Sequence, residues 1–540
     1  MGAELGAGTR SARSVGLWLT LLVVCGFGLR VLGLRRGLWY DEAWVLDSVR
    51  AASLHAMFFY HDWAQTTPPG VLLVLRSLRD VVGTAPETLR VRWVPWLCGV
   101  LTLALTARLS TRLFYGVFAL PVVMILALSP EIIWYATEIK QYAFDLLCMT
   151  AVLYSGWLYI EQPSRARAGL WLLLFAALAV FSYTLVFVLP AVVAVAILLP
   201  ADSPLMHRLR ALWLPAALAL LFCVLVYLVF ARPNSGLPTM YAYWHKGFVE
   251  SSGYSIGYFL RRVVAEQAAF LPFVVKSPLD VAVFLALAGG GVVGILRRWP
   301  GAKGQALLVL LTLPPLTVLL ANLIGFYPLA EFRLLYFLCV HVMLLLGFGL
   351  QWLTMQASGL LRAHAWRPLV HSFVVLSVVL ACGVGVMNKR VATVHGLPPS
   401  ATRLDMRAAV RFLHLQNDLE RPVFVHVALR QLFKEYQREF PVTSRVSYGA
   451  YGWPCCVPGK PWTSPEFNAA DVGLDVDAAV RFIGVHTGYL LIRKSRSTVR
   501  DLEYDMYARA IDEQGCLQAA RYNFAGVQLL KISCPPTTPP

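Results

Sequence analysis

The stretch VGLWLTLLVVCGFGLRVLGL, residues 15–34, followed by RRGLWYDEAW, residues 35–44, decides the fold class of this chain. A nearly uncharged run of this length is what a helix needs to cross a bilayer. The adjacent carboxylates Asp41 and Glu42 follow directly, with Tyr40 and Trp44 beside them. We therefore expect a spanning helix that delivers two acids to the membrane surface. Acids and aromatic residues at that depth are also ordinary markers of the water boundary, so this stretch alone leaves both readings open.

The composition of the whole chain is that of a membrane protein. Hydrophobic residues make up 58% of its 540 residues and charged residues only 14%, whereas an ordinary soluble domain is about 25% charged. The apolar runs end near residue 388, after which charged residues and turn signals become frequent. The sequence predicts a membrane domain over residues 1–388, with long outer loops at 35–90 and 232–276. A soluble domain of mixed α/β structure is expected over residues 389–540.

The apolar runs predict a mainly helical, polytopic protein with about eleven transmembrane helices. They are residues 15–34, 92–110, 114–129, 141–160, 169–184, 185–200, 211–231, 279–296, 305–325, 333–353 and 368–387. The segments that a cytoplasmic N-terminus would leave inside are basic, from Arg10 and Arg13 to Arg362 and Arg367. This bias favours a cytoplasmic N-terminus and an extracytoplasmic (periplasmic) C-terminal domain. The first run lacks a small-residue cleavage site, so we expect it to remain as a helix of an inner (plasma) membrane protein.

A formal net charge of +17 raises the possibility of a nucleic-acid partner. Nucleic-acid-binding proteins gather their basic residues on one soluble face. Here many of the basic residues lie in short loops between apolar runs, as topology signals do. We therefore expect no nucleic-acid partner.

Three predicted outer segments contain chemically informative residues. The first loop continues through His61 to the turn at 67–70, and an amphipathic helix over 71–82 is expected to lie in the interface. The second segment ends in Glu138-Ile-Lys140-Gln-Tyr142. A Lys in an outer turn runs against the positive-inside trend, and a phosphate headgroup would explain it. The alternative is a surface pair of Lys140 with Glu138 or Glu131, worth about 0–1 kcal/mol.

The third segment contains Arg333 and Tyr336 at the outer end of a late span. Arg333 either reaches water along the helix surface or contacts a phosphodiester with its planar, bidentate guanidinium. On a helix Arg333 and Tyr336 share a face, because residues three apart are neighbours.

Taken in order, these elements resemble a known family. An acidic pair follows the first span, a Pro-Pro turn precedes Arg92-x-x-Pro95, a Glu-x-Lys-x-Tyr turn comes later, and an Arg stands at a late span end. This order is similar to that of the GT-C membrane glycosyltransferases, in particular the bacterial relatives of protein O-mannosyltransferases and aminoarabinose transferases. The resemblance covers roughly residues 15–353.

The resemblance implies roles for residues of this chain. Asp41 would be the catalytic base, and Glu42 would support it or contact the acceptor. Lys140 and Arg333 would hold the phosphate of a polyprenyl-phosphate sugar donor. Arg92, Glu138, Tyr142 and Tyr336, which belong to the same motifs, are the further candidates for substrate binding, and His61 joins them because it lies in the same loop as Asp41. Two positions depart from the family pattern: Lys140 stands where Arg is frequent, and Arg333 and Tyr336 are not adjacent.

Such a site implies an inverting transfer by a single displacement. A carboxylate activates the acceptor hydroxyl, and cations stabilise the leaving lipid phosphate. The acceptor, whether lipid, glycan or protein, is left open by the sequence. No cofactor or metal is required for this chemistry, although a divalent cation is not excluded.

The tail is expected to contain helices at about 401–415 and 429–440 and strands at 421–426, 489–493 and 526–532. It would either shape the acceptor site or serve as a structural cap. Its outer location permits disulfides, and the four cysteines Cys455, Cys456, Cys516 and Cys534 allow three connectivities. The favoured bridge joins Cys516 and Cys534, which flank the last strand.

Two other functions fit a polytopic chain. A transporter or flippase would place charges at the membrane midplane, frequently in two related halves. The charges here gather at the outer ends of the runs, and the halves show no repeat. A non-catalytic scaffold with the tail as a binding module is the third possibility.

Overall fold

The computed structural model describes most of the chain and divides it into two compact units. The described residues are 2–34, 36–59, 66–80, 87–199, 204–235, 247–248, 264, 278–329, 332–359, 373, 376–377, 406–416, 421–426, 429–449, 469–484, 487–493, 502–524 and 527–535. The first unit comprises Met1–Arg35, Thr67–Arg232 and Trp244–His395. The second comprises Arg36–Thr66, Pro233–Tyr243 and Gly396–Pro540. Residues that follow the first span thus fold with the C-terminal residues.

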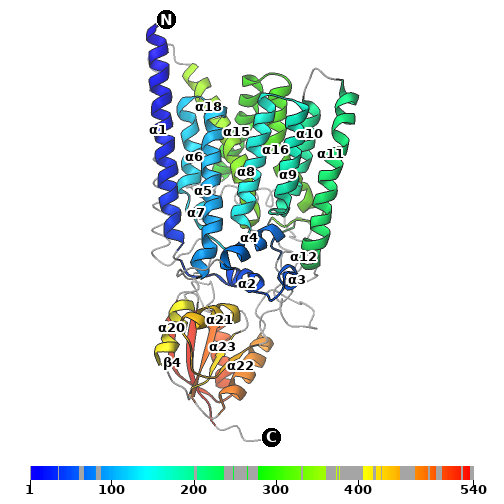
Figure 1. Ribbon diagram of the computed structural model, residues 1–540. Coiled ribbons are helices and arrows are strands. Elements are labelled where there is room, and N and C mark those ends of the chain that lie inside the picture. Colours follow the sequence, from blue (N-terminus) through cyan, green and yellow to red (C-terminus); the bar gives the residue numbers. More distant parts are fainter. Residues whose placement is uncertain are drawn as a thin grey trace. The chain divides into compact units, whose positions relative to one another are not determined.

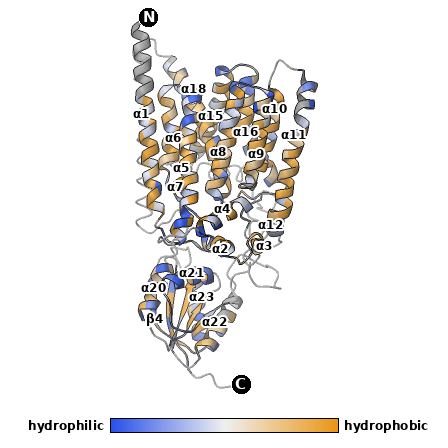
Figure 2. Ribbon diagram, in the orientation of Figure 1, coloured by the Kyte–Doolittle hydropathy of each residue, from blue (hydrophilic) through white to orange (hydrophobic). Residues whose placement is uncertain are grey.

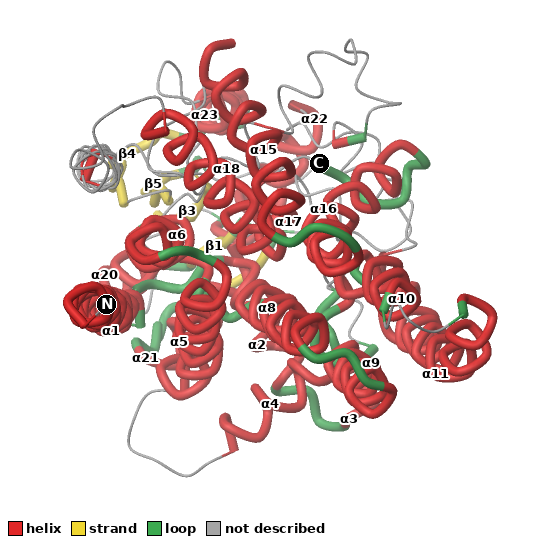
Figure 3. The backbone as a smooth tube through the Cα atoms, turned by 90° about the horizontal axis from the view of Figure 1, so that it is seen from above, coloured by secondary structure: helices red, strands yellow, loops and turns green. Residues whose placement is uncertain are grey.

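The first unit is a helix bundle. Its first half contains α1 (Gly2–Gly33), α4 (Pro69–Asp80), α5 (Glu87–Leu113), η1 (Gly116–Phe118), α6 (Ala119–Leu128), α7 (Pro130–Tyr135), α8 (Tyr142–Glu161), α9 (Arg165–Ala179), η2 (Tyr183–Phe187) and α10 (Leu189–Leu198). Its second half contains α11 (Leu205–Val226), η3 (Tyr227–Ala231), α15 (Pro278–Arg298), α16 (Ala302–Leu323), α17 (Phe332–Leu335), η5 (Tyr336–Leu338) and α18 (Cys339–Gly359). The short helix α12 (Arg232–Ser235) follows η3. Figure 3 shows α1 beside α5 and α6, and α11 beside α9 and α10.

Seven described helices are long and apolar enough to cross a membrane. They cover Ser14–Gly33, Glu87–Leu113, Tyr142–Glu161, Trp213–Ala231, Val281–Arg298, Ala302–Leu323 and Phe332–Ser358. Two shorter apolar helices cover Gly116–Leu128 and Leu189–Leu198. Apolar residues dominate the bundle (Figure 2) and remain exposed along α1 and α11, where Leu32 and Trp213 keep 72% and 63% of their surfaces. Such faces suit lipid as the solvent, so the polytopic helical fold is confirmed.

The expected number of about eleven spans stays a prediction. Seven of the expected runs coincide with the long helices. The expected run at 114–129 is a shorter apolar helix, and the pair at 169–200 is broken by the 3₁₀ turn η2. Most of the run at 368–387 lies outside the described residues.

Glycines allow α15 and α18 to pack backbone against backbone. A Cβ at Gly349 would lie 1.8 Å from the carbonyl oxygen of Leu287, and one at Gly291 would lie 2.2 Å from that of Leu345. Small residues at helix crossings permit this approach in membrane bundles, where van der Waals packing drives association. The crossing fixes the two helices that flank the cavity described below.

Gly349→Ala is expected to destabilise the protein. Its new methyl group meets a backbone carbonyl that cannot move alone, and overpacking of this kind costs about 1–3 kcal/mol. Gly289→Ala is the matched control, because nothing lies within 4 Å of a Cβ at that position of α15. Thermal unfolding in detergent should show a lower midpoint for Gly349→Ala and an unchanged or higher midpoint for Gly289→Ala. Equal midpoints for Gly349→Ala and the wild type would refute the close crossing.

The second unit is built on a five-stranded mixed sheet in the order β2-β1-β3-β5-β4. Its elements are α2 (Tyr40–Val49), α3 (Leu54–Phe58), α20 (Met406–Gln416), β1 (Val423–Val425), α21 (Arg430–Glu439), β2 (Val446–Tyr448), α22 (Ala469–Ile483), β3 (Thr487–Arg493), α23 (Leu502–Glu513), β4 (Leu517–Phe524) and β5 (Val527–Ser533). Strand β1 pairs in parallel with β2 and β3, while β5 pairs antiparallel with β3 and β4. The strands and helices α20 to α23 are coloured yellow to red in Figure 1, whereas α2 and α3 are blue.

Side chains alternate between the two faces of the sheet along each strand, so the sheet has a buried layer on each face. Leu490 and Leu530 are partners in the β3–β5 register and pack with Val480 of α22 and Ile511 of α23 in one buried cluster. Residues one step along each strand point to the opposite face, and α20 packs against β4 and β5. Each predicted element of the tail has a counterpart in the structure. The Cys516–Cys534 disulfide, at a sequence separation of 18, confirms the predicted pair, while Cys455 and Cys456 lie outside the described residues.

Candidate functional site

A buried turn between α7 and α8 holds three of the predicted site residues. Lys140 keeps 5% of its surface exposed, Glu138 keeps 4%, and Tyr142 begins α8. The turn is tight, because the Lys140 backbone N–H donates to the Glu138 carbonyl oxygen at 2.7 Å. The exposed surface pair considered for Lys140 is therefore incompatible with the structure. A buried ammonium group requires anionic or polar groups around it.

Tyr135 connects this turn to the segment that carries Arg333. Its ring centroid lies 5.3 Å from that of Tyr142 and 5.2 Å from that of Tyr336. The ring of Phe332 completes the cluster, 5.8 Å from Tyr135. Edge-on and tilted aromatic contacts at these separations are favourable and restrict the relative position of their helices. Residues almost two hundred positions apart in the chain are thus brought together.

Two hydrogen bonds fix the Arg333 segment. The Tyr336 hydroxyl donates to the Ile132 carbonyl oxygen of α7 at 3.2 Å, and the Tyr327 hydroxyl donates to the Leu334 carbonyl oxygen at 2.8 Å. Burial raises the pKa of Tyr327, so its phenol remains a donor. Arg333 itself is partly buried at the start of α17.

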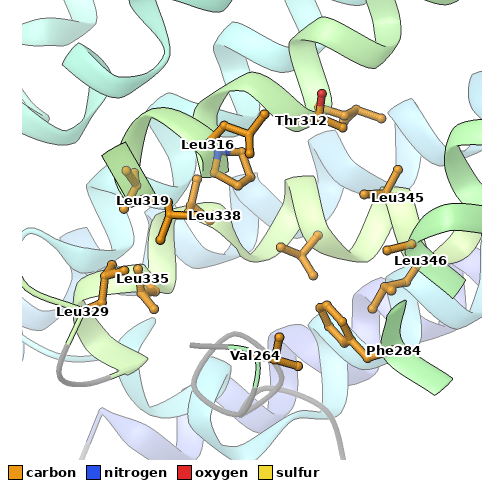
Figure 4. A pocket seen from close by; sticks show the side chains of 15 residues that line it. Val264, Phe284, Thr312, Leu316, Leu319, Leu329, Leu335, Leu338, Leu345 and Leu346 are labelled. Atoms are coloured by element: carbon orange, nitrogen blue, oxygen red, sulfur yellow. The ribbon is translucent and has the colours of Figure 1, made fainter. Parts of the chain in front are cut away.

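An apolar cavity adjoins this segment. It has a volume of about 290 Å³, is partly open, and is lined largely by residues of α15, α16, α17, η5 and α18. Leu335 and Leu338, the second and fifth residues after Arg333, form part of its wall, facing Leu319 and Leu346 (Figure 4). Among the described residues that line it, Thr312 supplies the only side-chain hydroxyl. A space of this composition accommodates a hydrocarbon chain and offers almost nothing to a sugar or an ion.

The acidic pair lies in the second unit, on the first turn of α2. Glu42 is fully buried and accepts hydrogen bonds from Arg36 at 3.0 and 3.2 Å and from the Trp39 backbone N–H at 2.9 Å. It thereby caps the helix that it belongs to. Asp41 keeps 7% of its surface exposed. These contacts suit Glu42 for support of the helix that carries Asp41.

The remaining predicted residues are placed as follows. Arg92 is buried near the start of α5, and its Nη1 donates to the Leu34 carbonyl oxygen at the end of α1, at 3.4 Å. His61 lies outside the described residues, as does Glu331. Within the described ranges, no three His, Cys, Asp or Glu side chains form a group that could hold a metal ion.

Sequence reasoning missed two buried charged residues of the first unit. Arg30 has no exposed surface and donates to the carbonyl oxygens of Leu126 and Ala127 at 2.7 and 3.3 Å. It therefore caps the C-terminus of α6, where cations are stabilised by the helix dipole. Asp145 of α8 accepts a hydrogen bond from the Ser182 hydroxyl at 2.6 Å. A charge within a predicted span is the signal that could have revealed both.

Arg30→Met is expected to destabilise the bundle by about 1–3 kcal/mol, because it leaves buried carbonyl oxygens at the end of α6 without a donor. Helix α7 leads from that end to the turn that holds Lys140, so activity should fall with stability. Arg108→Met, which changes an exposed Arg of α5, is the control. Thermal unfolding in detergent should place Arg30→Met below the control, and coincident transitions would show that the cap contributes nothing.

The chain is similar to a known protein family in sequence and to solved structures in fold. Residues 66–230 match the family model described as dolichyl-phosphate-mannose-protein mannosyltransferase. The crystal structure of ArnT from Cupriavidus metallidurans bound to undecaprenyl phosphate is similar over 96% of this chain and 97% of ArnT, with 16% identity and a TM-score of 0.53. This chain resembles the protein mannosyltransferases and has the GT-C fold.

A second solved structure shows the same GT-C fold. The archaeal oligosaccharyltransferase AglB from Archaeoglobus fulgidus, in complex with an inhibitory peptide and a dolichol-phosphate, is 12% identical. The similarity covers 96% of this chain and 74% of AglB, with a TM-score of 0.50. No curated protein matches the chain in sequence. The assignment of the GT-C fold therefore rests on the family model and on the similarity to solved structures.

Proposed function

We propose that this protein is a membrane glycosyltransferase that transfers a sugar from a polyprenyl-phosphate donor to a hydroxyl acceptor. One observation carries the proposal: the buried Lys140 turn and the Arg333 segment are joined through Tyr135, beside an apolar cavity. Cations next to a space for hydrocarbon are what a lipid phosphate requires. The proteins of similar fold whose structures contain undecaprenyl phosphate or dolichol-phosphate support the same donor class.

On the donor side, the lipid chain would occupy the cavity lined by Leu335 and Leu338. Lys140 and Arg333 would bind the phosphate, Lys140 as a compact charge and Arg333 as a planar fork. Glu138 would hold the ammonium group of Lys140 in place, and Tyr142 and Tyr336 would fix the helices that present the two cations. These cations also stabilise the negative charge that grows on the phosphate as it leaves.

On the acceptor side, Asp41 would take the proton of the attacking hydroxyl. The oxygen forms a bond to the anomeric carbon while the bond from that carbon to the lipid phosphate breaks. A single displacement inverts the anomeric centre and releases polyprenyl phosphate. Glu42 supports α2, which carries Asp41, and Arg92 holds the end of α1 that leads to α2. His61 would contact the acceptor, and no metal ion is required for this sequence of events.

The proposal includes the location of the reaction. Basic segments favour a cytoplasmic N-terminus, which puts the C-terminal domain and the reaction on the outer face of the inner membrane. The acceptor would then be an envelope lipid, glycan or protein. A cysteine at position 2 and another at position 538 should react with an impermeant maleimide from opposite sides of sealed vesicles.

The test of this function is transfer from a panel of donors by the purified protein. Radiolabelled sugars on polyprenyl phosphate, and the same sugars on nucleotides, are supplied with acceptor membranes. We expect label to move into the acceptor from at least one lipid-linked sugar and from none of the nucleotide sugars. Transfer from nucleotide sugars alone would overturn the proposed donor class. An inactive but folded protein would favour a transporter or a scaffold.

A further inference from the structure

Two neighbouring residues of α21 contact the two ends of α2, which lies almost four hundred positions earlier in the chain. The Leu38 backbone N–H, just before α2, donates to the Tyr436 hydroxyl at 2.6 Å. Arg50, the C-cap of α2, pairs with Glu435, its Nη2 lying 2.8 Å from Oε2. Helix α21 belongs to the C-terminal sheet domain, and both helices belong to the second compact unit.

These contacts are shielded from water. Leu38 and Tyr436 keep 3% and 6% of their surfaces exposed. The side chains of Arg50 and Glu435 keep 14% and 5%. A partly buried, charge-assisted pair is stronger than an exposed one, and Arg438 adds a second contact to Glu435 at 3.3 Å. The contacts of Tyr436 with Leu38 and of Glu435 with Arg50, together called the clamp, are therefore more than surface contacts.

The two contacts of the clamp lie on either side of Asp41 in the sequence, at residues 38 and 50. Glu42 fixes the start of α2 internally through Arg36, but that pair does not attach the helix to anything outside residues 36–49. Helix α21 attaches both ends of α2 to the C-terminal domain. A displacement of about 1 Å at a reacting group can cost about a hundredfold in rate, so a helix held in this way is the position-defining element for Asp41.

We propose that Glu435 and Tyr436 are positioning residues for Asp41, so that the C-terminal domain is part of the catalytic apparatus and not a separate acceptor-binding module or cap. The proposal rests on the proposed function, because Asp41 is assigned as the base there. The role of α21 in this proposal is to hold α2, and with it Asp41, in position.

The test uses conservative changes in the full-length protein. Tyr436→Phe removes the hydroxyl that accepts from Leu38 and keeps the ring, and Glu435→Gln removes the charge that pairs with Arg50. We expect kcat to fall about tenfold in each, with the donor KM within about twofold of wild type. The double exchange Arg50→Glu with Glu435→Arg restores an ion pair and should recover part of kcat.

A double-mutant cycle separates positioning from general damage. If Tyr436 acts through Asp41, Tyr436→Phe should cost nothing further in an Asp41→Asn background, since coupled residues are non-additive. A merely structural role would lower the residual activity again. Additive losses in this cycle would overturn the proposal.

Two matched controls lie in the same domain. Glu439 is on the same helix as Glu435 and pairs with Arg407, and the Tyr504 hydroxyl donates to Gln518 at 3.0 Å. Glu439→Gln and Tyr504→Phe should leave kcat unchanged. Losses equal to those of Glu435→Gln and Tyr436→Phe would contradict a specific clamp.

Amide hydrogen exchange tests the clamp without an assay of sugar transfer. The amides of residues 38–50 should exchange faster in Glu435→Gln and Tyr436→Phe than in wild type, while those of β3 and β5 stay protected. Unchanged exchange over residues 38–50 would overturn the inference. If the wild type transfers no sugar, the proposed function fails, and the exchange measurement still decides whether α21 holds α2.

Discussion

Asp41→Asn is expected to lower sugar transfer by about a thousandfold, because an amide cannot accept the proton of the attacking hydroxyl and general-base catalysis contributes about 10²–10⁴. The change keeps the size of the side chain, and the cap made by Glu42 remains in place. The donor KM should therefore change little. Transfer is measured as radiolabel incorporated into acceptor membranes, with protein whose thermal transition matches the wild type.

Asp47→Asn provides the matched control for this change. Asp47 lies on the same helix, near its other end, and is assigned no part in the reaction. Its transfer rate should stay within about twofold of wild type. Equal rates for Asp41→Asn and Asp47→Asn would remove Asp41 as the base.

Lys140→Ala is expected to lower kcat/KM for the donor by about a hundredfold or more, the usual cost of removing one electrostatic contact to a developing charge. Both parameters should suffer, because the ammonium group would bind the ground-state phosphate and the leaving phosphate. Lys140→Arg should retain part of the activity, since guanidinium keeps the charge and adds a planar fork. Steady-state kinetics with a fixed acceptor and varied donor measures both effects.

Lys303→Ala serves as the control for Lys140. Lys303 belongs to the same unit, and its ammonium group lies 5.2 Å from the centre of the Trp157 ring. It has no role in the proposed reaction, so its donor kinetics should match wild type. Unchanged donor kinetics in Lys140→Ala would contradict the phosphate assignment.

The fold class was predictable because its signals are local. Long apolar runs mark spanning helices by length alone, and the amphipathic run after the Pro-Pro turn became α4, close to the predicted bounds. Short strands such as β2 and the edge strand β4 were missed, because brief or exposed strands lack a clear periodic pattern. The 3₁₀ turn η2 (Tyr183–Phe187) lies at the predicted boundary between the apolar runs 169–184 and 185–200.

The candidate site was predictable only in part, for a physical reason. Lys140 and Arg333 stood out because a cation at an outer turn contradicts the topology signal. Arg30 and Asp145 did not, since their partners are helix carbonyls and a hydroxyl from distant segments. The attachment of α2 to α21 was equally invisible, because a contact between residues 38 and 436 has no local sequence pattern.

The structure also refines the roles within the acidic pair. The family resemblance implied that Asp41 is the base and that Glu42 either supports it or contacts the acceptor. Three hydrogen bonds occupy the Glu42 carboxylate, so its loss should affect the stability of α2 before it affects chemistry. Of the two alternatives for Glu42, these contacts favour the support of α2.

The most direct test of the account is the fate of the lipid during one round of reaction. A donor labelled in both its sugar and its polyprenyl chain is incubated with the purified protein and acceptor membranes, and the lipid products are separated. The account predicts one polyprenyl monophosphate released for each sugar transferred. Sugar that moves while still attached to intact lipid, with no polyprenyl monophosphate released, would contradict glycosyl transfer and establish transport instead.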